Sequence, residues 1–339
     1  MTKILLIVFS LAGLVSYSQK YNGLAQTPPM GWNTWNTFKT KFDEEIIKRI
    51  ADQIVDSRMK DAGYQYIVLD DGWMSMTRDS ADNLVADPVK FPHGIKALAA
   101  YIHARGLKIG IYNCAGVKTC GGYPGSRGFE FQDAKLYASW DIDYLKLDWC
   151  NTEGLNAQEA YRLMSEAIRA AGRPMIFSIC EWGTNQPWLW AADLAQLWRT
   201  TQDIYNCFDC FLDHGTWYWA GPMRIIDLEN DLRKYSGPGH WNDPDMLEVG
   251  NGLSAAEDRS HFSMWCMLAA PLIAGNDLRH MTNETLQILT NPDAISIDQY
   301  SLGIQGFRYQ KEDSLEVWVK PLKDQKWAVA FLNRSVKSR

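Results

Sequence analysis

The chain of 339 residues is long enough for one large α/β barrel or for two domains of ordinary size. Hydrophobic residues make up 46% of it and charged residues 22%, which excludes an intrinsically disordered protein. The net charge of −6 offers no basic surface, so we expect no nucleic acid partner. The 15 Trp residues could fill a core or offer flat faces to sugar rings, and composition alone leaves both uses open.

The N-terminus reads MTKILLIVFSLAGLVSYSQ, the pattern of a signal peptide. Lys3 precedes a run of about a dozen apolar residues, and Ser16 and Ser18 are small residues suited to a cleavage site before Gln19. We expect residues 1–18 to be removed, with an uncleaved N-terminal anchor as the alternative. The pattern predicts an exported protein, periplasmic or secreted, with no membrane span in the mature chain and with disulfides permitted.

The chain has seven cysteines, so at least one has no partner within the chain. Cys207 and Cys210 form a C-x-x-C motif, which could indicate a redox pair or half of a zinc site. No second C-x-x-C or H-x-x-x-H completes a metal set, so we expect either a small loop disulfide or two free thiols.

Short apolar runs alternate with longer segments of helical period along most of the chain. One such segment, 44–63, carries Ile47, Ile50 and Ile54 on one side and ends at Gly63, a suitable helix stop. The predicted strands are 30–35, 64–71, 107–113, 143–148, 175–180, 197–203, 240–247 and 271–276. Eight β-α units predict an α/β protein with a (β/α)8 TIM barrel over residues 19–296. A doubly wound sheet is the alternative, but no G-x-G-x-x-G follows an early strand.

Polar side chains follow most of the predicted strands. In (β/α)8 barrels the active site lies at the C-terminal ends of the strands. The polar residues at these ends are Asp70, Asp71, Asn113, Asp148, Cys180, Glu181, Asp203, Asp243 and Asp245. Lys146 and Asp148 also lie inside an apolar strand, where a buried charge costs several kcal/mol unless it is paired. We therefore expect a site at this rim of the barrel.

A rim rich in carboxylates could bind a metal or hydrolyse a glycoside. The six histidines form no ligand-like pair, and the cation site that H-W-N-D-P-D at 240–245 would form is the weaker alternative. Glycoside hydrolysis requires two carboxyl groups, hydroxyl-binding side chains and aromatic faces. The side chains that supply the last two are Lys146, Arg199, Trp35, Trp73, Trp149 and Trp182. We expect neither a metal nor another cofactor.

Nine motifs in chain order resemble the α-galactosidases (melibiases) of glycoside hydrolase family 27. They are PPMGWNTWN (28–36), LDDGW (69–73), GIYN (110–113), TCGGYPGS (119–126), YLKLDWC (144–150), CEWG (180–183), WRTTQDI (198–204), GHWNDPDML (239–247) and APLIAGND (270–277). The resemblance spans nearly the whole mature chain. It implies a retaining exo-α-galactosidase that removes terminal α-linked galactose from oligosaccharides or polysaccharides.

The resemblance implies two catalytic residues. Asp148 matches the nucleophile that forms a covalent glycosyl-enzyme, and Asp203 matches the general acid/base. Lys146 and Arg199 match ligands of the sugar hydroxyls, and Lys146 would favour the ionised form of Asp148. A retaining mechanism requires the two carboxyl groups to be about 5 Å apart.

The resemblance also implies the residues that recognise the sugar. Asp70 and Asp71 match the pair that binds the hydroxyls on C4 and C6, where an unpaired buried acceptor costs about 1–3 kcal/mol. Further implied contacts are Trp35 and Tyr112 beside the ring and Asp245 and Met246 on the far wall. Cys120 and Cys150 match a family disulfide beside the nucleophile.

Four residues bear on substrate choice within the family. Cys180, Glu181 and Trp182 are bulky where α-N-acetylgalactosaminidases have small residues, which favours galactose. Asp70 implies a C6 hydroxyl and so disfavours a β-L-arabinopyranosidase. These two activities are the alternatives, and a non-catalytic sugar-binding protein is a third. The sequence does not indicate the natural leaving group or the oligomeric state.

Two segments depart from the family pattern. The Cys-bearing stretch YNCFDCF (205–211) follows the acid/base and borders the leaving-group side. Residues 297–339 resemble only the first strands of the family's C-terminal antiparallel β-domain, so we expect a partial, apparently truncated, β-domain with unpaired sheet edges.

Overall fold

The computed structural model describes residues 20–335. The predicted signal peptide at 1–18 lies outside these described residues. Within 20–335, no helix combines the length and the apolar character needed to cross a membrane.

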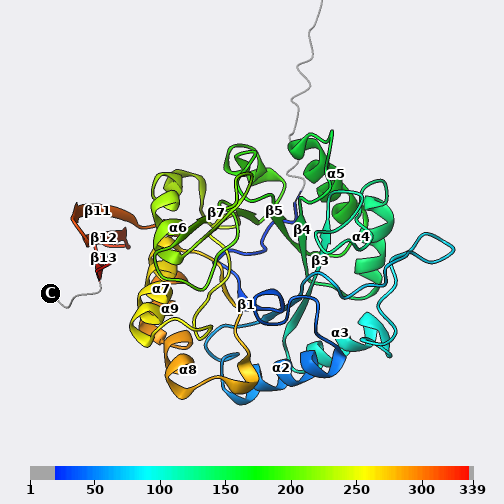
Figure 1. The fold of residues 1–339 in the computed structure, drawn as a ribbon, viewed down its shortest axis with the longest axis horizontal. Helices are drawn as coiled ribbons and strands as arrows, with labels where there is room; N and C mark the ends of the chain where they lie inside the picture. The colour runs from blue at the N-terminus through cyan, green and yellow to red at the C-terminus, as the bar shows by residue number, and fades with distance from the viewer. Residues whose placement is uncertain (1–19, 336–339) are drawn as a thin grey trace, which may run out of the picture.

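Eight parallel strands form the inner sheet of a barrel (Figure 1), in the order β10-β1-β2-β3-β4-β5-β6-β9. They are β1 (Met30–Asn33), β2 (Tyr66–Leu69), β3 (Lys108–Cys114), β4 (Tyr144–Asp148), β5 (Ile176–Cys180), β6 (Leu197–Arg199), β9 (Trp241–Asp243) and β10 (Leu272–Ala274). A parallel bridge between Leu247 and Ala274 joins the segment after β9 to β10 and closes the ring. The predicted (β/α)8 barrel is confirmed, and each predicted strand coincides with an observed one, although β3 extends one residue past its predicted end at 113.

Helices surround this sheet. They are α1 (Trp35–Phe38), α2 (Glu44–Asp56), α3 (Gly94–Ala104), α4 (Glu130–Ser139), α5 (Ala157–Ala170), α6 (Pro222–Glu229), α7 (Ala255–Leu268), α8 (Asn283–Leu289) and α9 (Pro292–Asp298), with 3-10 turns at Pro187–Leu189, Ala191–Asp193, Asn230–Tyr235 and Leu278–His280. The prediction that the second helix runs to Gly63 is wrong. Arg58 takes a left-handed conformation (φ 65°) just beyond Asp56, and the helix therefore ends seven residues before Gly63.

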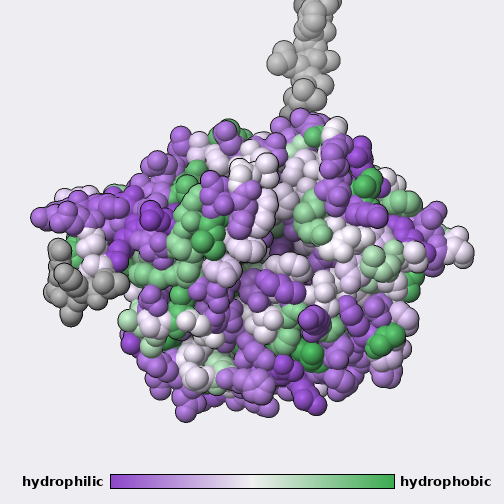
Figure 2. Space-filling view, in the orientation of Figure 1, coloured by the Kyte–Doolittle hydropathy of each residue, from purple (hydrophilic) through white to green (hydrophobic). Residues whose placement is uncertain are grey.

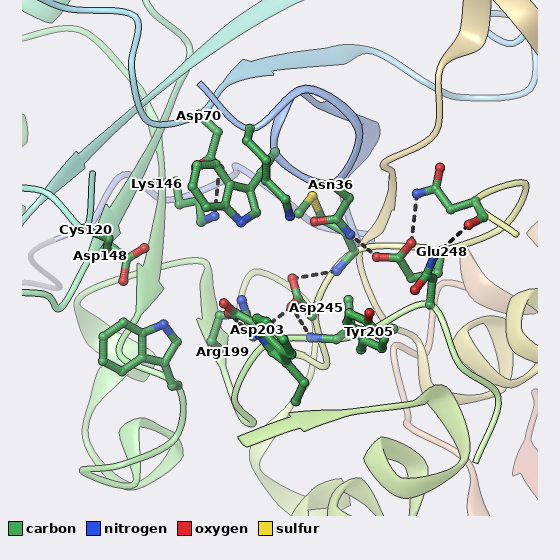
Figure 3. Close-up of a pocket in the computed structure, with 18 of the residues that line it drawn as sticks. Asn36, Asp70, Cys120, Lys146, Asp148, Arg199, Asp203, Tyr205, Asp245 and Glu248 are labelled. Atoms are coloured by element: carbon green, nitrogen blue, oxygen red, sulfur yellow. Dashed lines mark hydrogen bonds and ion pairs between the residues drawn. The ribbon is translucent and has the colours of Figure 1, made fainter. Parts of the chain in front are cut away.

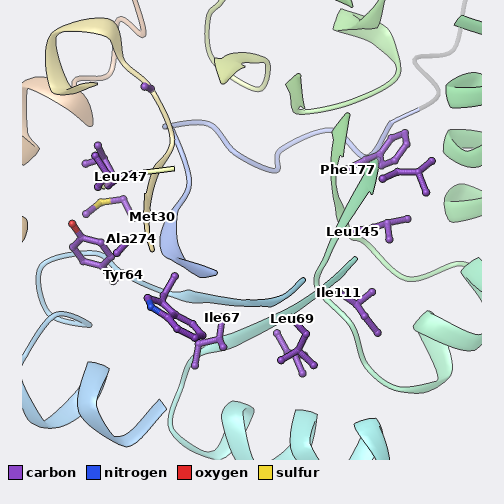
Figure 4. Packing of buried hydrophobic residues seen from close by; sticks show 14 of the residues in the cluster. Met30, Tyr64, Ile67, Leu69, Ile111, Leu145, Phe177, Leu247 and Ala274 are labelled. Carbon is purple, nitrogen blue, oxygen red and sulfur yellow. The ribbon is translucent and has the colours of Figure 1, made fainter. Parts of the chain in front are cut away.

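Side chains of the strands alternate between two apolar layers. Ile67, Leu69 and Ile111 point outward and pack beneath the helices (Figure 4). Tyr66 and Tyr144 belong to a second cluster on the inner side of the sheet, where their rings lie 5.8 Å apart. Because side chains alternate along a strand, every second residue after these two also faces inward.

This alternation explains the charges inside β4. Lys146 and Asp148 follow Tyr144 at intervals of two, and Asp70 follows Tyr66 and Val68 in the same way. All three charged side chains therefore lie on the inner side of the barrel, at the C-terminal ends of their strands. The apolar residues nearer the strand starts fill the barrel below them.

Two antiparallel sheets lie outside the barrel. The three-stranded sheet contains β11 (Phe307–Glu312), β12 (Leu315–Pro321) and β13 (Trp327–Asn333) and sits beside α6 and α7 (Figure 1). The predicted C-terminal antiparallel strands are thus confirmed. Its inner face buries Trp318, and the Lys320 ammonium donates to the carbonyl of Cys266 in α7 at 2.9 Å. On its outer face, Phe331 is 83% exposed.

The second antiparallel sheet is a hairpin of β7 (Phe211–Asp213) and β8 (Tyr218–Ala220), which was not predicted. Cys207 and Cys210 form a disulfide at its base, which decides between the two alternatives left open for this C-x-x-C motif. In the described residues the cysteines without a disulfide are Cys114, Cys180 and Cys266, and all three are buried.

Candidate active site

A cavity of about 470 Å³ opens where the C-terminal ends of the strands converge. Figure 2 shows the surface hollowed near the middle of this face, and Figure 3 shows the side chains around the hollow. The predicted site residues that line it are Trp35, Asp70, Tyr112, Lys146, Asp148, Trp182, Arg199, Asp203, Asp245 and Met246. The fold therefore brings together residues that are up to 211 positions apart in the sequence (35 to 246).

Asp70 and Lys146 form a buried ion pair on one side of the cavity (Figure 3). The Lys146 ammonium donates to Asp70 Oδ2 at 2.7 Å, and the Asn33 amide donates to the same oxygen at 2.9 Å. Burial alone would lower the pKa of Lys146, but the surrounding acidic groups, Asp70 foremost, together outweigh it and hold that pKa well above its usual value. The pair is thus a fixed arrangement of one donor and one acceptor, suited to binding neighbouring sugar hydroxyls.

Asp148 ends β4 and is 7% exposed. Its Oδ1 accepts a hydrogen bond from the Trp149 N–H at 2.8 Å. Burial raises the pKa of this carboxyl to about 7, although the charge of Lys146 opposes the rise and that of Asp203 adds to it. Lys146 therefore favours the ionised form, as predicted, but burial has the larger effect.

Arg199 holds two carboxylates on another wall of the cavity. Its guanidinium lies 2.8 Å from Asp245 Oδ2 and 3.3 Å from Asp203 Oδ1. Asp245 also accepts from the Ile204 N–H at 2.8 Å and is 5% exposed, whereas the side chain of Asp203 is 46% exposed. Of the two carboxyl groups predicted to be catalytic, that of Asp148 is therefore buried and that of Asp203 is exposed.

Of the predicted aromatic faces, Trp73 and Trp149 do not line the cavity, and neither do three of the contacts that the family resemblance implies. Asp71 is buried and accepts from the Gly121 N–H at 2.7 Å. Glu181 is buried and accepts from Asn185 within its own loop at 2.6 and 2.7 Å. Cys180 is buried at the end of β5, with its sulfur 3.8 Å from the Arg199 guanidinium. Their predicted contacts with sugar stay predictions, and the structure places each behind the cavity wall.

Several lining residues were not predicted to contact the sugar: Asn36, Lys39, Cys120, Ile204, Tyr205, Asn206, Trp219, Glu248 and Asn251. Glu248 is the one acid among these nine; it is buried, and its carboxylate accepts from Asn36 and, at 2.8 Å, from Asn251. Burial raises its pKa to about 7. Its place directly after the D-P-D-M-L motif could have indicated that it lies at the same rim.

The predicted disulfide between Cys120 and Cys150 is confirmed, with its Cα atoms 5.2 Å apart. It joins the loop after β3 to the residue two positions past Asp148, and the Tyr112 hydroxyl donates to Cys120 Sγ at 3.4 Å. Among the described residues, Cys120, Asp148 and Cys150 form the one grouping with the spacing of metal ligands. Because the two sulfurs are bonded to each other, neither is the thiolate that a metal would bind.

A barrel whose cavity is lined by two candidate catalytic carboxyl groups is typical of a glycoside hydrolase, and comparison with known proteins gives its family. The family model "Alpha galactosidase A" matches residues 27–300, and "Alpha galactosidase A C-terminal beta sandwich domain" matches 303–337. The chain belongs to this family of α-galactosidases, and the resemblance to glycoside hydrolase family 27 is confirmed.

Individual relatives agree with this assignment. Alpha-galactosidase A of Cellvibrio japonicus is 54% identical over 96% of this chain and 80% of its own length. The alpha-galactosidase of Cyamopsis tetragonoloba is 46% identical over 93% of this chain and 74% of its own. The crystal structure of alpha-galactosidase I from Mortierella vinacea superposes with a TM-score of 0.89 at 40% identity, over 92% of this chain and 82% of that one.

Proposed function

We propose that this protein is a retaining exo-α-galactosidase that releases terminal α-linked D-galactose through a covalent glycosyl-enzyme. The observation that carries the proposal is the pairing of a buried and an exposed carboxyl group, Asp148 and Asp203, on one cavity. Two carboxyl groups in different environments are what a double displacement at a glycosidic carbon requires.

In the first step, the Asp148 carboxylate attacks the anomeric carbon while the bond from that carbon to the leaving oxygen breaks. Trp149 N–H holds Oδ1, so Oδ2 is the attacking atom. The carboxylic acid of Asp203 gives its proton to the leaving oxygen. In the second step, Asp203 takes a proton from water as the water oxygen attacks the same carbon, and the Asp148 carboxylate is released.

The Asp70–Lys146 pair would orient the sugar by its hydroxyls. Galactose carries an axial hydroxyl on C4, and a sugar that lacks it would leave the buried Asp70 carboxylate short of a donor, at a cost of about 1–3 kcal/mol. Trp35 would pack against the ring. Because the apolar cluster on the inner side of the barrel closes the cavity below, a single terminal residue would fit there, which favours exo action.

We expect hydrolysis of p-nitrophenyl α-D-galactoside with a kcat/KM at least about tenfold higher than for the α-N-acetylgalactosaminide or the β-L-arabinopyranoside. Parallel initial-rate measurements on the three substrates test this. A preference for the arabinoside would contradict the proposed use of Asp70 and keep the mechanism. Folded protein that hydrolyses none of them would favour the non-catalytic sugar-binding alternative.

The pH dependence should report the ionisation of Asp148. Because attack requires its carboxylate and its pKa is raised to about 7, kcat/KM for the p-nitrophenyl galactoside should fall about tenfold per unit as the pH drops below about 7. The nitrophenolate is a good leaving group, so Asp203 contributes little to this profile. A constant kcat/KM between pH 7 and pH 5 would show that Asp148 ionises at a lower pH.

We also propose that the protein is exported. Support comes from the signal-peptide pattern at 1–18 and from the two disulfides, which persist in oxidising compartments.

A further inference from the structure

The hairpin of β7 and β8, together with Tyr205 in the segment before it, carries a row of aromatic rings that the proposed function does not use. Tyr205 and Trp219 line the cavity, and their rings stack at 5.1 Å with an angle of 11°. Trp217 packs edge-on against Trp219 at 5.0 Å, and His214 stacks on Trp217 at 3.9 Å. We call these four residues the aromatic platform. It begins in the cavity wall and continues along the hairpin away from it.

The platform is attached to the segment that carries the proposed acid/base. The Ala220 N–H donates to the Asp203 carbonyl at 3.2 Å, and the Tyr205 N–H donates to the Ala220 carbonyl at 2.9 Å. The Tyr218 N–H donates to the Gln202 side chain at 2.8 Å. Because an acid must contact the oxygen that it protonates, the leaving group of any substrate lies beside this segment. The platform is therefore on the leaving-group side of the cavity.

Packing among these rings leaves much of Trp217 and Tyr205 exposed. Side chains alternate along a strand, so Trp217 and Trp219 share one face while Tyr218 lies on the other and stacks on Phe211 at 4.7 Å. Trp217 is nevertheless 42% exposed and Tyr205 39% exposed. Exposed aromatic faces that continue from a polar cavity suit the C–H faces of sugar rings, which are apolar while their edges are polar.

The base of the hairpin is held at several points. The Cys207–Cys210 disulfide closes the turn before β7, and the Gly221 N–H donates to the Cys210 carbonyl at 3.0 Å. Asp209 forms ion pairs with Arg224 at 2.8 Å and with Arg334, just past β13, at 3.2 Å. A surface fixed before binding loses less entropy when a ligand binds, which favours a binding role.

We propose that the aromatic platform binds the leaving-group sugars of an oligosaccharide substrate, so that the enzyme prefers α-galactosides whose leaving group contains two or more sugar units. The inference rests on the proposed function, because Asp203 defines the leaving-group side. The ligand is a neutral oligosaccharide. Raffinose and a galactosylated mannotriose represent its two sources, soluble oligosaccharides and the side chains of a galactomannan.

The test is the ratio of kcat/KM for each oligosaccharide to kcat/KM for α-galactosyl fluoride, which has no leaving-group sugar. Trp217→Ala should lower this ratio about tenfold for one or both oligosaccharides, because the lost contact is absent from the fluoride reaction. Trp217→Tyr keeps an aromatic face and should retain most of the ratio. Trp327→Ala, which removes a 54% exposed Trp on β13, is the matched control and should leave the ratio unchanged.

The outcomes separate the two proposals. If the unaltered protein hydrolyses the fluoride but Trp217→Ala keeps both kcat/KM ratios within a factor of two of the unaltered protein's, the platform does not bind the leaving group. The proposed function then still stands. If the unaltered protein hydrolyses none of these substrates, the proposed function is wrong. Calorimetric titration with raffinose and mannotriose then tests whether the platform binds oligosaccharides. Binding that is lost in Trp217→Ala supports the platform proposal. No binding by the unaltered protein, or equal binding by both proteins, overturns it.

Discussion

The Asp148→Asn variant is expected to lose about four orders of magnitude or more in kcat for p-nitrophenyl α-galactoside while keeping its fold. The amide has the shape of the carboxylate but cannot attack the anomeric carbon. Its oxygen can still accept the Trp149 N–H, and Lys146 keeps its ion pair with Asp70 at 2.7 Å. The substitution also removes a buried charge, so no large loss of stability is expected.

A variant with no side chain at position 148 tests the same role through recovery of activity rather than its loss. Asp148→Gly leaves room for a small anion beside the anomeric carbon, so added azide should restore part of the rate and yield β-galactosyl azide. That product forms by one displacement and reports which face of the sugar Asp148 occupies. Asp324→Asn, in the turn between β12 and β13 where φ is 56°, is the matched control, because Asn tolerates that conformation. Full activity in Asp148→Asn would refute the nucleophile assignment.

The sequence predicted the barrel and most of the cavity because both depend on short-range patterns. Strands of alternating apolar residues fix which side chains face inward, and parallel strands bring their ends to one rim. The sequence alone therefore places Asp70, Lys146 and Asp148 on the inner side of the barrel. Their pairing could not be predicted in this way, because Lys146 is near Asp148 in sequence but bonds past β3 to Asp70, at the end of β2.

The sequence was less informative where the conformation of a loop determines which side chains reach the cavity. Glu181 is one residue past the end of β5, and Trp182, next to it, has a φ of 59°. That turn aims Trp182 into the cavity and buries Glu181 behind it, which no strand periodicity describes. The β7–β8 hairpin has strands of three residues each, too short for an alternating pattern to stand out.

For Asp203→Ala, the loss should depend on the leaving group. A sugar leaving group needs a proton as the bond breaks, so kcat/KM for raffinose should fall about 10³-fold. Fluoride and nitrophenolate depart with little help, so kcat/KM for α-galactosyl fluoride should fall by less than about tenfold. The cavity should keep its shape, because Arg199 retains its 2.8 Å contact with Asp245 after losing the 3.3 Å contact with Asp203.

The second half of the reaction supplies an independent readout of Asp203. Without a base to activate water, the glycosyl-enzyme on Asp148 should accumulate with the fluoride substrate, visible as a burst of fluoride release and as added mass on the protein. Azide, which needs no base, should then raise the turnover rate and give α-galactosyl azide. This product has the anomeric configuration opposite to that expected from Asp148→Gly, because it arises after two displacements rather than one. Equal losses of kcat/KM on raffinose and on the fluoride, with no burst, would assign Asp203 a structural role. Azide products of opposite anomeric configuration from the two variants would instead place the two carboxyl groups on opposite faces of one sugar.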